Sequence, residues 1–237
     1  LVSATSCLGA LGNSLFAVVI WIGASGNRIG GTAVGEGNVI AFNDSGVLVD
    51  SNFINAVNNS ILGNKIWANT QYVFGLENDG ITFNDAGDGD SGANDLLNYP
   101  VLTSVTQNGT DLDIQFDLDV PAGNYRIEFF DNPNGINANG YGGGEIFLGA
   151  VTVTSLGTGT QTFNETLASV SMTNATTVTA TATEDLGGNN FGSTSEFGPA
   201  LSVTTIVGAI KDTYIDENNP ANNYGTSSSL LMDESGG

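Results

Sequence analysis

The densest group of potential ligand side chains is the glycine-rich stretch Asn84–Asp95, with the sequence NDAGDGDSGAND. Carboxylates crowded in a flexible backbone repel one another unless a cation lies among them, and calcium prefers six to eight oxygen ligands. The spacing differs from that of an EF-hand, because Gly92 and Tyr99 stand where two ligands are expected when counting from Asp88. A solvated acidic linker is the alternative interpretation. The candidate calcium ligands are Asp85, Asp88, Asp90, Asp95, Asn84 and Asn94.

Groups suited to acid–base or nucleophilic chemistry are sparse. The chain has no histidine, and its 4 basic side chains are Arg28, Lys65, Arg126 and Lys211. Arg28 and Lys65 both take the variable position of a short repeated phrase, where ordinary outward-facing charges are expected. The sequence contains no nucleophile elbow, phosphate loop or dinucleotide fingerprint. We therefore assign no catalytic residue, and the sequence favours a protein that is not an enzyme.

The charge balance restricts the partners of the protein. Its 25 acidic side chains against 4 basic ones give a formal net charge of −21. This field repels nucleic acid and anionic membranes, so we expect neither as a partner. The apolar run Leu15–Ile22 is far shorter than the roughly 20 residues needed to span a bilayer, and we predict that it is a buried strand. The single Cys7 excludes an internal disulfide and a cysteine-based zinc site.

A phrase of asparagine, any residue and isoleucine recurs between Asn27 and Asn69. Each copy is too short to bury its isoleucine alone, whereas stacked copies would bury all of them in one column. Asparagine tolerates the left-handed conformation needed at a corner, and its amide can bond to the copies above and below. The predicted structural ladder consists of Asn27, Asn38, Asn59 and Asn64 with Ile29, Ile40, Ile61 and Ile66.

Two longer units align around this phrase, and a third begins at Tyr72. Each unit offers three short strands separated by glycine and asparagine turns, as one triangular rung of a parallel β-helix requires. Successive rungs should pair in parallel. The predicted pairs are Val18–Ile22 with Val47–Asp50, Val47–Asp50 with Val73–Leu76, Ile29 with Ile61, and Ile40 with Ile66.

A change of period marks a second segment, at about residues 99–206. In Asp111–Val120, with the sequence DLDIQFDLDV, apolar residues alternate with acidic or polar ones, which predicts a strand with one buried and one acidic face. About seven such strands separated by turns predict an immunoglobulin-like β-sandwich. The tryptophan and cysteine pair of antibody domains is missing. We expect this segment to fold as a separate unit.

Two parts of the chain resemble known families. The motif NRIGGT followed by GEGNVIAFN resembles the right-handed parallel β-helix repeats of large bacterial surface and secreted proteins, over about residues 13–83. The ending KDTYIDENNPANNYGTSSSL resembles the start of carbohydrate-binding β-sandwich modules of secreted bacterial enzymes. The resemblances imply an all-β protein with a few β-helix rungs at 1–98, a sandwich at 99–206 and the start of a carbohydrate-binding-like domain at 207–237.

These features lead to an expectation about function. We expect a non-catalytic, modular bacterial protein, extracellular or on the cell surface, that serves as a stalk, adhesin or polysaccharide-associated scaffold. Its expected partners are polysaccharide or copies of itself, with calcium as a possible stabilising ion. One alternative is a fragment of a polysaccharide lyase or hydrolase whose catalytic rungs lie outside this chain. Another alternative is a structural subunit that assembles end to end through unpaired rung edges.

Overall fold

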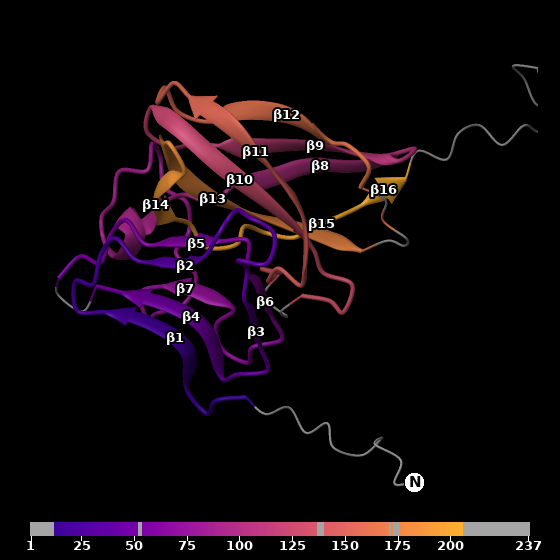
Figure 1. Ribbon diagram of the computed structural model, residues 1–237. Helices are drawn as coiled ribbons and strands as arrows, with labels where there is room; N and C mark the ends of the chain where they lie inside the picture. Colours follow the sequence, from indigo (N-terminus) through magenta and orange to yellow (C-terminus); the bar gives the residue numbers. More distant parts are fainter. Residues whose placement is uncertain (1–11, 52–53, 137–139, 171, 173–175, 206–237) are drawn as a thin grey trace, which may run out of the picture. The chain divides into compact units, whose positions relative to one another are not determined.

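A computed structural model describes residues 12–51, 54–136, 140–170, 172 and 176–205, and the predicted third domain at 207–237 lies outside them. The described residues belong to one compact unit up to Thr204. They form small parallel sheets, antiparallel sheets and one short 3-10 helix, η1 (Ala93–Leu96), as Figure 1 shows. The protein is therefore all-β, as predicted. No helix in this described part is long and apolar enough to span a membrane.

Residues 12–98 form the parallel region. The chain visits three sheets in turn and returns to each, so that one strand from every sheet makes up one rung. This arrangement of small parallel sheets is consistent with a short β-helix. The three sheets are β1 (Phe16–Trp21) with β4 (Ser45–Asp50) and β7 (Phe74–Leu76), β2 (Arg28–Gly30) with β5 (Ser60–Leu62), and β3 (Val39–Ala41) with β6 (Lys65–Trp67).

The predicted parallel pairing within this region is confirmed. The strand partners include Val18 with Val47, Val47 with Phe74, Ile29 with Ile61, and Ile40 with Ile66. Most of the side chains that the pairing stacks are buried, whereas Val18 and Ile29 are partly buried. Val47 and Val49 are fully buried, and Ile66 is 1% exposed. Stacking of successive rungs therefore builds the core of the parallel region.

The first strand differs from its prediction as a buried strand. Within β1 only Ile20 is buried, whereas Val19 and Trp21 are 42% and 50% exposed, and the flanking Leu15 and Ile22 are more exposed still. The physical reason is position, because β1 lies at the edge of its sheet, next to β4 alone. Alternate side chains of such a strand point away from the core.

Residues 99–205 form the antiparallel region, which has two sheets packed around one core. Buried side chains of both sheets contribute to it, among them Phe116 and Phe129, whose rings lie 5.8 Å apart edge to face. In β9 the apolar side chains are buried and the acidic ones are half-exposed, which confirms the predicted alternation. The strands are β8 (Val101–Asn108), β9 (Asp111–Leu118), β12 (Gln161–Leu167) and β16 (Thr204–Thr205) in one sheet, and β10 (Gly123–Asp131), β11 (Ile146–Ser155), β13 (Thr177–Gly187), β14 (Asn190–Thr194) and β15 (Leu201–Ser202) in the other.

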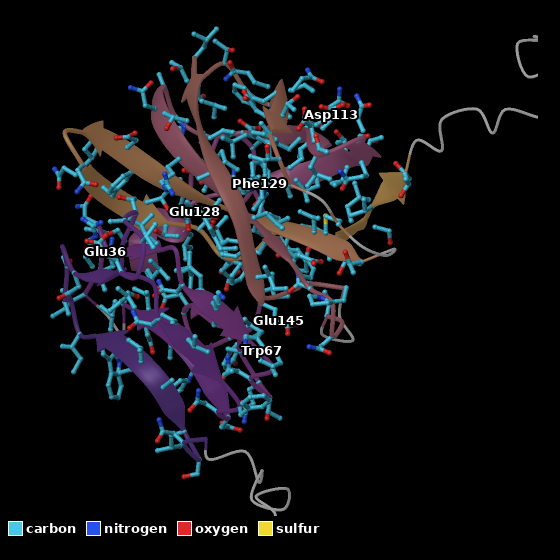
Figure 2. All side chains as sticks on the ribbon, turned by 45° about the vertical axis from the view of Figure 1, so that its right-hand side comes forward. Glu36, Trp67, Asp113, Glu128, Phe129 and Glu145 are labelled. Atoms are coloured by element: carbon cyan, nitrogen blue, oxygen red, sulfur yellow. The ribbon has the colours of Figure 1, made fainter. Side chains whose placement is uncertain are left out.

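The two regions share a second core. Phe130 of β10 and Phe197 belong to the same buried cluster as Ile61, Ile66 and other side chains of the parallel region. The rings of Phe130 and Phe197 lie 5.4 Å apart edge to face. Figure 2 shows the consequence for neighbouring residues of β10: Phe129 lies inside the antiparallel region, while Glu128 lies where β10 meets the parallel region. The last rung is thus closed by side chains from the antiparallel region.

Candidate functional site

The acidic loop that connects the two regions is closed by two asparagines. The amide of Asn84 bonds twice to the backbone of Tyr99, accepting from its N–H at 2.9 Å and donating to its carbonyl oxygen at 2.8 Å. Asn98 does the same for Asp85, at 3.0 and 2.9 Å. These paired amides hold the two ends of the loop together. Asn98 is a residue that the sequence analysis did not single out.

Three of the predicted calcium ligands meet inside this loop. Carboxylate oxygens of Asp85, Asp88 and Asp90 all lie within 4.8 Å of one another. Backbone amides fix two of these side chains, because Gly89 N–H approaches both oxygens of Asp85 at 3.1 and 3.2 Å, and Asn98 N–H donates to Asp88 at 2.6 Å. Oxygen donors alone at this spacing suit a hard divalent cation such as calcium.

The environment of the cluster disfavours three negative charges. Burial and the neighbouring charges of Asp90 and Asp85 together raise the pKa of Asp88 to about 7, against the lowering effect of the bond from Asn98 N–H. Burial and the charge of Asp85 also raise the pKa of Asp90. A bound divalent cation would reverse this balance, because it stabilises the ionised carboxylates.

The other three predicted ligands are engaged elsewhere. Asn84 is bonded to Tyr99, as described above, and Asp95 lies outside the three-carboxylate cluster and accepts a hydrogen bond from Ser193 Oγ at 2.9 Å. Asn94 is fully buried, and its Oδ1 accepts from Asn59 N–H at 3.0 Å. Its amide nitrogen donates to the carbonyl oxygen of Asn59 at 2.7 Å. Asn94 therefore belongs to the asparagine ladder.

A sequence signal for this role of Asn94 exists. Asn94–Leu96 reads asparagine, aspartate, leucine, which continues the repeated phrase with leucine in place of isoleucine. Leu96 packs against the core cluster of the parallel region, as the isoleucines do. The acidic residues around Asn94 favoured a metal-binding interpretation, so Asn94–Leu96 was not identified as a copy of the repeated phrase.

Three corners of the ladders follow one rule. The backbone N–H and the amide nitrogen of one asparagine both donate to Oδ1 of the asparagine in the next rung. The distances are 3.0 and 2.9 Å from Asn27 to Asn59, 3.0 and 2.9 Å from Asn38 to Asn64, and 3.0 and 3.0 Å from Asn43 to Asn69. Each corner is thereby tied to the one above it.

The sequence analysis expected the ladder asparagine itself to be left-handed. In the structure the left-handed residue of most corners is instead the residue before it. Positive φ angles occur at the residues preceding five ladder asparagines, namely Gly26 (71°), Phe42 (63°), Asn58 (57°), Gly63 (62°) and Ala68 (50°). Asn94 is an exception, with a φ of 49°. The left-handed residue turns the chain, and the following asparagine side chain then points along the stack.

The antiparallel region satisfies backbone amides of the last rung. Glu196 accepts from Leu76 N–H and from Thr82 N–H, both at 2.8 Å. Glu128 accepts from Gly63 N–H at 2.8 Å and pairs with Arg126 at 2.8 Å. Burial raises the pKa of Glu128, and it raises that of Glu196 to about 7. The sequence analysis missed both glutamates.

A hydroxyl group and a glycine also bond to the last rung. Together with Glu196 and Glu128 they form what we call the cap. Thr194 Oγ1 accepts from Ile61 N–H at 2.9 Å. The glycine-rich stretch Gly140–Glu145 lies between β10 and β11, and its Gly144 exchanges two backbone hydrogen bonds with Ile66, at 2.9 and 2.7 Å. A Cβ atom on neighbouring Gly143 would lie 2.3 Å from the carbonyl oxygen of Ile66, so this close approach requires glycine.

The basic residues of the parallel region lie at the surface. Arg28 pairs with Glu36 at 3.5 Å, with both side chains partly exposed, and Lys65 of β6 is exposed.

Comparison of the chain with protein-family models, with curated proteins and with solved structures found no match.

Proposed function

We propose that the chain is a non-catalytic module of an extracellular or cell-surface protein. In this proposal a short right-handed parallel β-helix is joined rigidly to an immunoglobulin-like sandwich, and the pair serves as a stalk or scaffold. The observation that carries the proposal is the cap, in which Glu196, Glu128 and Thr194 bond to backbone amides of the last rung. Such a joint suits a load-bearing connection between modules better than a mobile linker.

The same joint argues against end-to-end assembly through the last rung. An edge strand recruits another chain through unpaired backbone groups. Here Gly63 and Leu76 donate their amides to side chains, and Ile66 pairs with Gly144. Partner recognition through polysaccharide stays a prediction that rests on residues 207–237.

Calcium would reinforce this joint. The cluster of Asp85, Asp88 and Asp90 lies in the chain between β7 and β8, which belong to different regions. A bound ion would join three side chains of a glycine-rich loop and lower its freedom in the folded state. Any ion that binds only the folded state raises the melting temperature by mass action.

The test of the calcium role is a set of melts in millimolar calcium and in EDTA with sodium at matched ionic strength. We expect calcium to raise the melting temperature of the wild type and to have less effect on Asp88→Asn/Asp90→Asn. A matched control, Asp111→Asn/Asp117→Asn, removes two charges from β9 and should keep the full response. Because the pKa of Asp88 is about 7, calcium must displace a proton at low pH, so the rise should be larger at pH 8 than at pH 6.

Two outcomes would contradict the calcium role. An equal response in both double variants would place the ion elsewhere, and an equal effect of sodium would reduce it to screening of the −21 charge. The non-catalytic role is tested separately, by incubation with a panel of polysaccharides. Release of reducing ends or unsaturated products by the purified chain would overturn it.

A further inference from the structure

A surface cavity at the seam of the two regions has an unusual charge. Its volume is about 470 Å³, and its wall is formed by residues 31–35 and Gly37 of one loop together with Asn38, Val39, Gly63, Lys65, Arg126 and Phe147. None of these lining residues is acidic, although the chain has 25 acidic and 4 basic side chains. Two of the 4 basic residues, Lys65 and Arg126, line this one cavity.

Arg126 is held in place by the protein itself. Its Nε donates to Glu128 at 2.8 Å, and its side chain is 18% exposed. Glu128 is fixed in turn by the N–H of Gly63, another lining residue, at 2.8 Å. Within the described residues the terminal amino groups of the Arg126 guanidinium make no hydrogen bond, so they are free to meet a ligand. An arginine anchored in this way presents its remaining donors in a fixed geometry.

Lys65 supplies the uncompensated charge. It is exposed and has no ion pair in the part of the chain that the structure describes. The acidic residue of the nearby loop, Glu36, is engaged by Arg28 at 3.5 Å and by the N–H of Ala33 at 2.9 Å. Because Arg126 and Glu128 neutralise each other, the cavity carries about one net positive charge, which matches a monoanion better than a dianion.

Apart from Thr32 and Asn38, the rest of the wall is apolar or glycine. Val39 is 70% exposed, and Phe147 lies half-buried in the opposite region. A volume of about 470 Å³ lies within the range of small-molecule sites, which combine apolar walls with a few placed polar groups. An exposed valine and a half-buried phenylalanine beside two cations therefore suit a ligand with an apolar face and one acidic group.

We propose that this cavity binds a small organic carboxylate. The carboxylate would bond to Lys65 and to the terminal amino groups of Arg126, and the carbon skeleton would lie against Val39 and Phe147. The site is separate from the acidic loop and does not depend on calcium.

Benzoate is a suitable probe, because it joins one carboxylate to a flat apolar face. Benzamide is its neutral counterpart of equal size, and inorganic phosphate is an anion without an apolar face. Each is titrated into ¹⁵N-labelled protein at constant ionic strength, with the backbone amides of Gly37 and Gly63 as reporters. We expect saturable shifts with benzoate and weaker or absent ones with benzamide and phosphate.

Variants test whether Lys65 supplies the positive charge that binds benzoate. Lys65→Gln changes an exposed side chain and should weaken benzoate binding about threefold or more, as loss of a partly exposed ion pair predicts. Lys65→Arg keeps the positive charge at this position and should bind benzoate about as well as the wild type. Equal shifts with benzamide, equal shifts with phosphate, unchanged binding by Lys65→Gln, or no saturable benzoate binding would each overturn the proposal.

Discussion

At the scale of single residues, the ladder asparagines show why no other side chain fits the corner. Asn64 accepts from the N–H and the amide of Asn38 and donates to the carbonyl oxygen of Ile29 at 2.8 Å. Aspartate would keep the acceptor, lose the donor and bury a charge, while glutamine would place the amide one bond too far out. The isoleucine two positions later, Ile66, then points into the core.

Replacing Asn64 by alanine should lower the free energy of unfolding by about 2–4 kcal/mol, because three hydrogen bonds are lost and the N–H of Asn38 is left without its acceptor. Urea denaturation followed by circular dichroism measures this change. The control is Asn124→Ala, at an exposed position, which we expect to cost less than about 0.5 kcal/mol. Similar losses in the two variants would argue against a special role for the ladder.

At the scale of elements, the cap replaces the next rung. Short parallel strands at the end of a stack leave amides without partners, and buried amides without partners are costly. The antiparallel region supplies carboxylate, hydroxyl and backbone acceptors at the positions where another rung would have supplied carbonyl groups. Burying Glu128 and Glu196 is the cost of this solution, and it is reflected in their raised pKa values.

The isolated segment 99–206 should fold, because the core between its two sheets is built from its own side chains. It should nevertheless expose Phe130 and Phe197, which the parallel region covers in the whole chain. We expect a cooperative melt at a lower temperature than that of the whole chain, together with fluorescence of a hydrophobic dye.

Substitution of Phe197 by serine in the isolated segment should reduce the dye fluorescence. A segment with the full melting temperature and no dye binding would show that the shared core contributes nothing to stability. An unfolded segment would instead place the boundary between the regions elsewhere.

Some features of these elements can be predicted from the sequence and others cannot. The stacking of Ile40 on Ile66 follows from the repeated phrase of asparagine, any residue and isoleucine, and the alternation of β9 follows from a period of two residues. Both patterns are readable in one chain. Glu128 and Glu196 contact amides that lie 65 and 120 positions away. No spacing rule connects such distant residues, so the cap was not predicted. Of the six proposed calcium ligands, three cluster, because the other side chains bond to backbone or to Ser193.

At the scale of the whole molecule, acidity and stability are linked through buried carboxylates. The pKa values of Glu196 and Asp88 are about 7 in the folded protein, against 4.5 and 3.8 for exposed groups. In both cases the folded state holds the proton more tightly than the unfolded chain. Their contribution to stability is therefore complete below the unfolded pKa and is lost as the pH rises toward 7 and slightly above.

Without calcium, the protein should thus be more stable at pH 5 than at pH 8, and Glu196 alone should account for about 3 kcal/mol of the difference. Urea denaturation in EDTA across this range measures the slope. Glu196→Gln should flatten the slope, although it also lowers stability at every pH by losing an amide acceptor. Glu165→Gln, on the partly exposed face of β12, should leave the slope unchanged. A stability that rises with pH in the wild type would contradict this account.

The ladders have one more consequence, which concerns chemical ageing. Asparagine deamidates when the backbone nitrogen of the following residue attacks the side-chain carbonyl carbon. In this stack that nitrogen is already engaged: Ser60 N–H donates to the Asn27 carbonyl oxygen at 2.8 Å, Lys65 N–H to Asn38 at 2.8 Å and Thr70 N–H to Asn43 at 3.0 Å. The bonds that join the rungs therefore also protect Asn59, Asn64 and Asn69 from reaction.

Exposed Asn108, followed by Gly109 in the β8–β9 turn, has no such stacked neighbour and should deamidate before the ladder asparagines. Peptide mass spectrometry after prolonged incubation at mildly alkaline pH measures the order of loss. Earlier modification of the ladder asparagines would contradict this protection. If the protection holds, the hydrogen bonds that join the rungs also make the ladder asparagines resistant to deamidation.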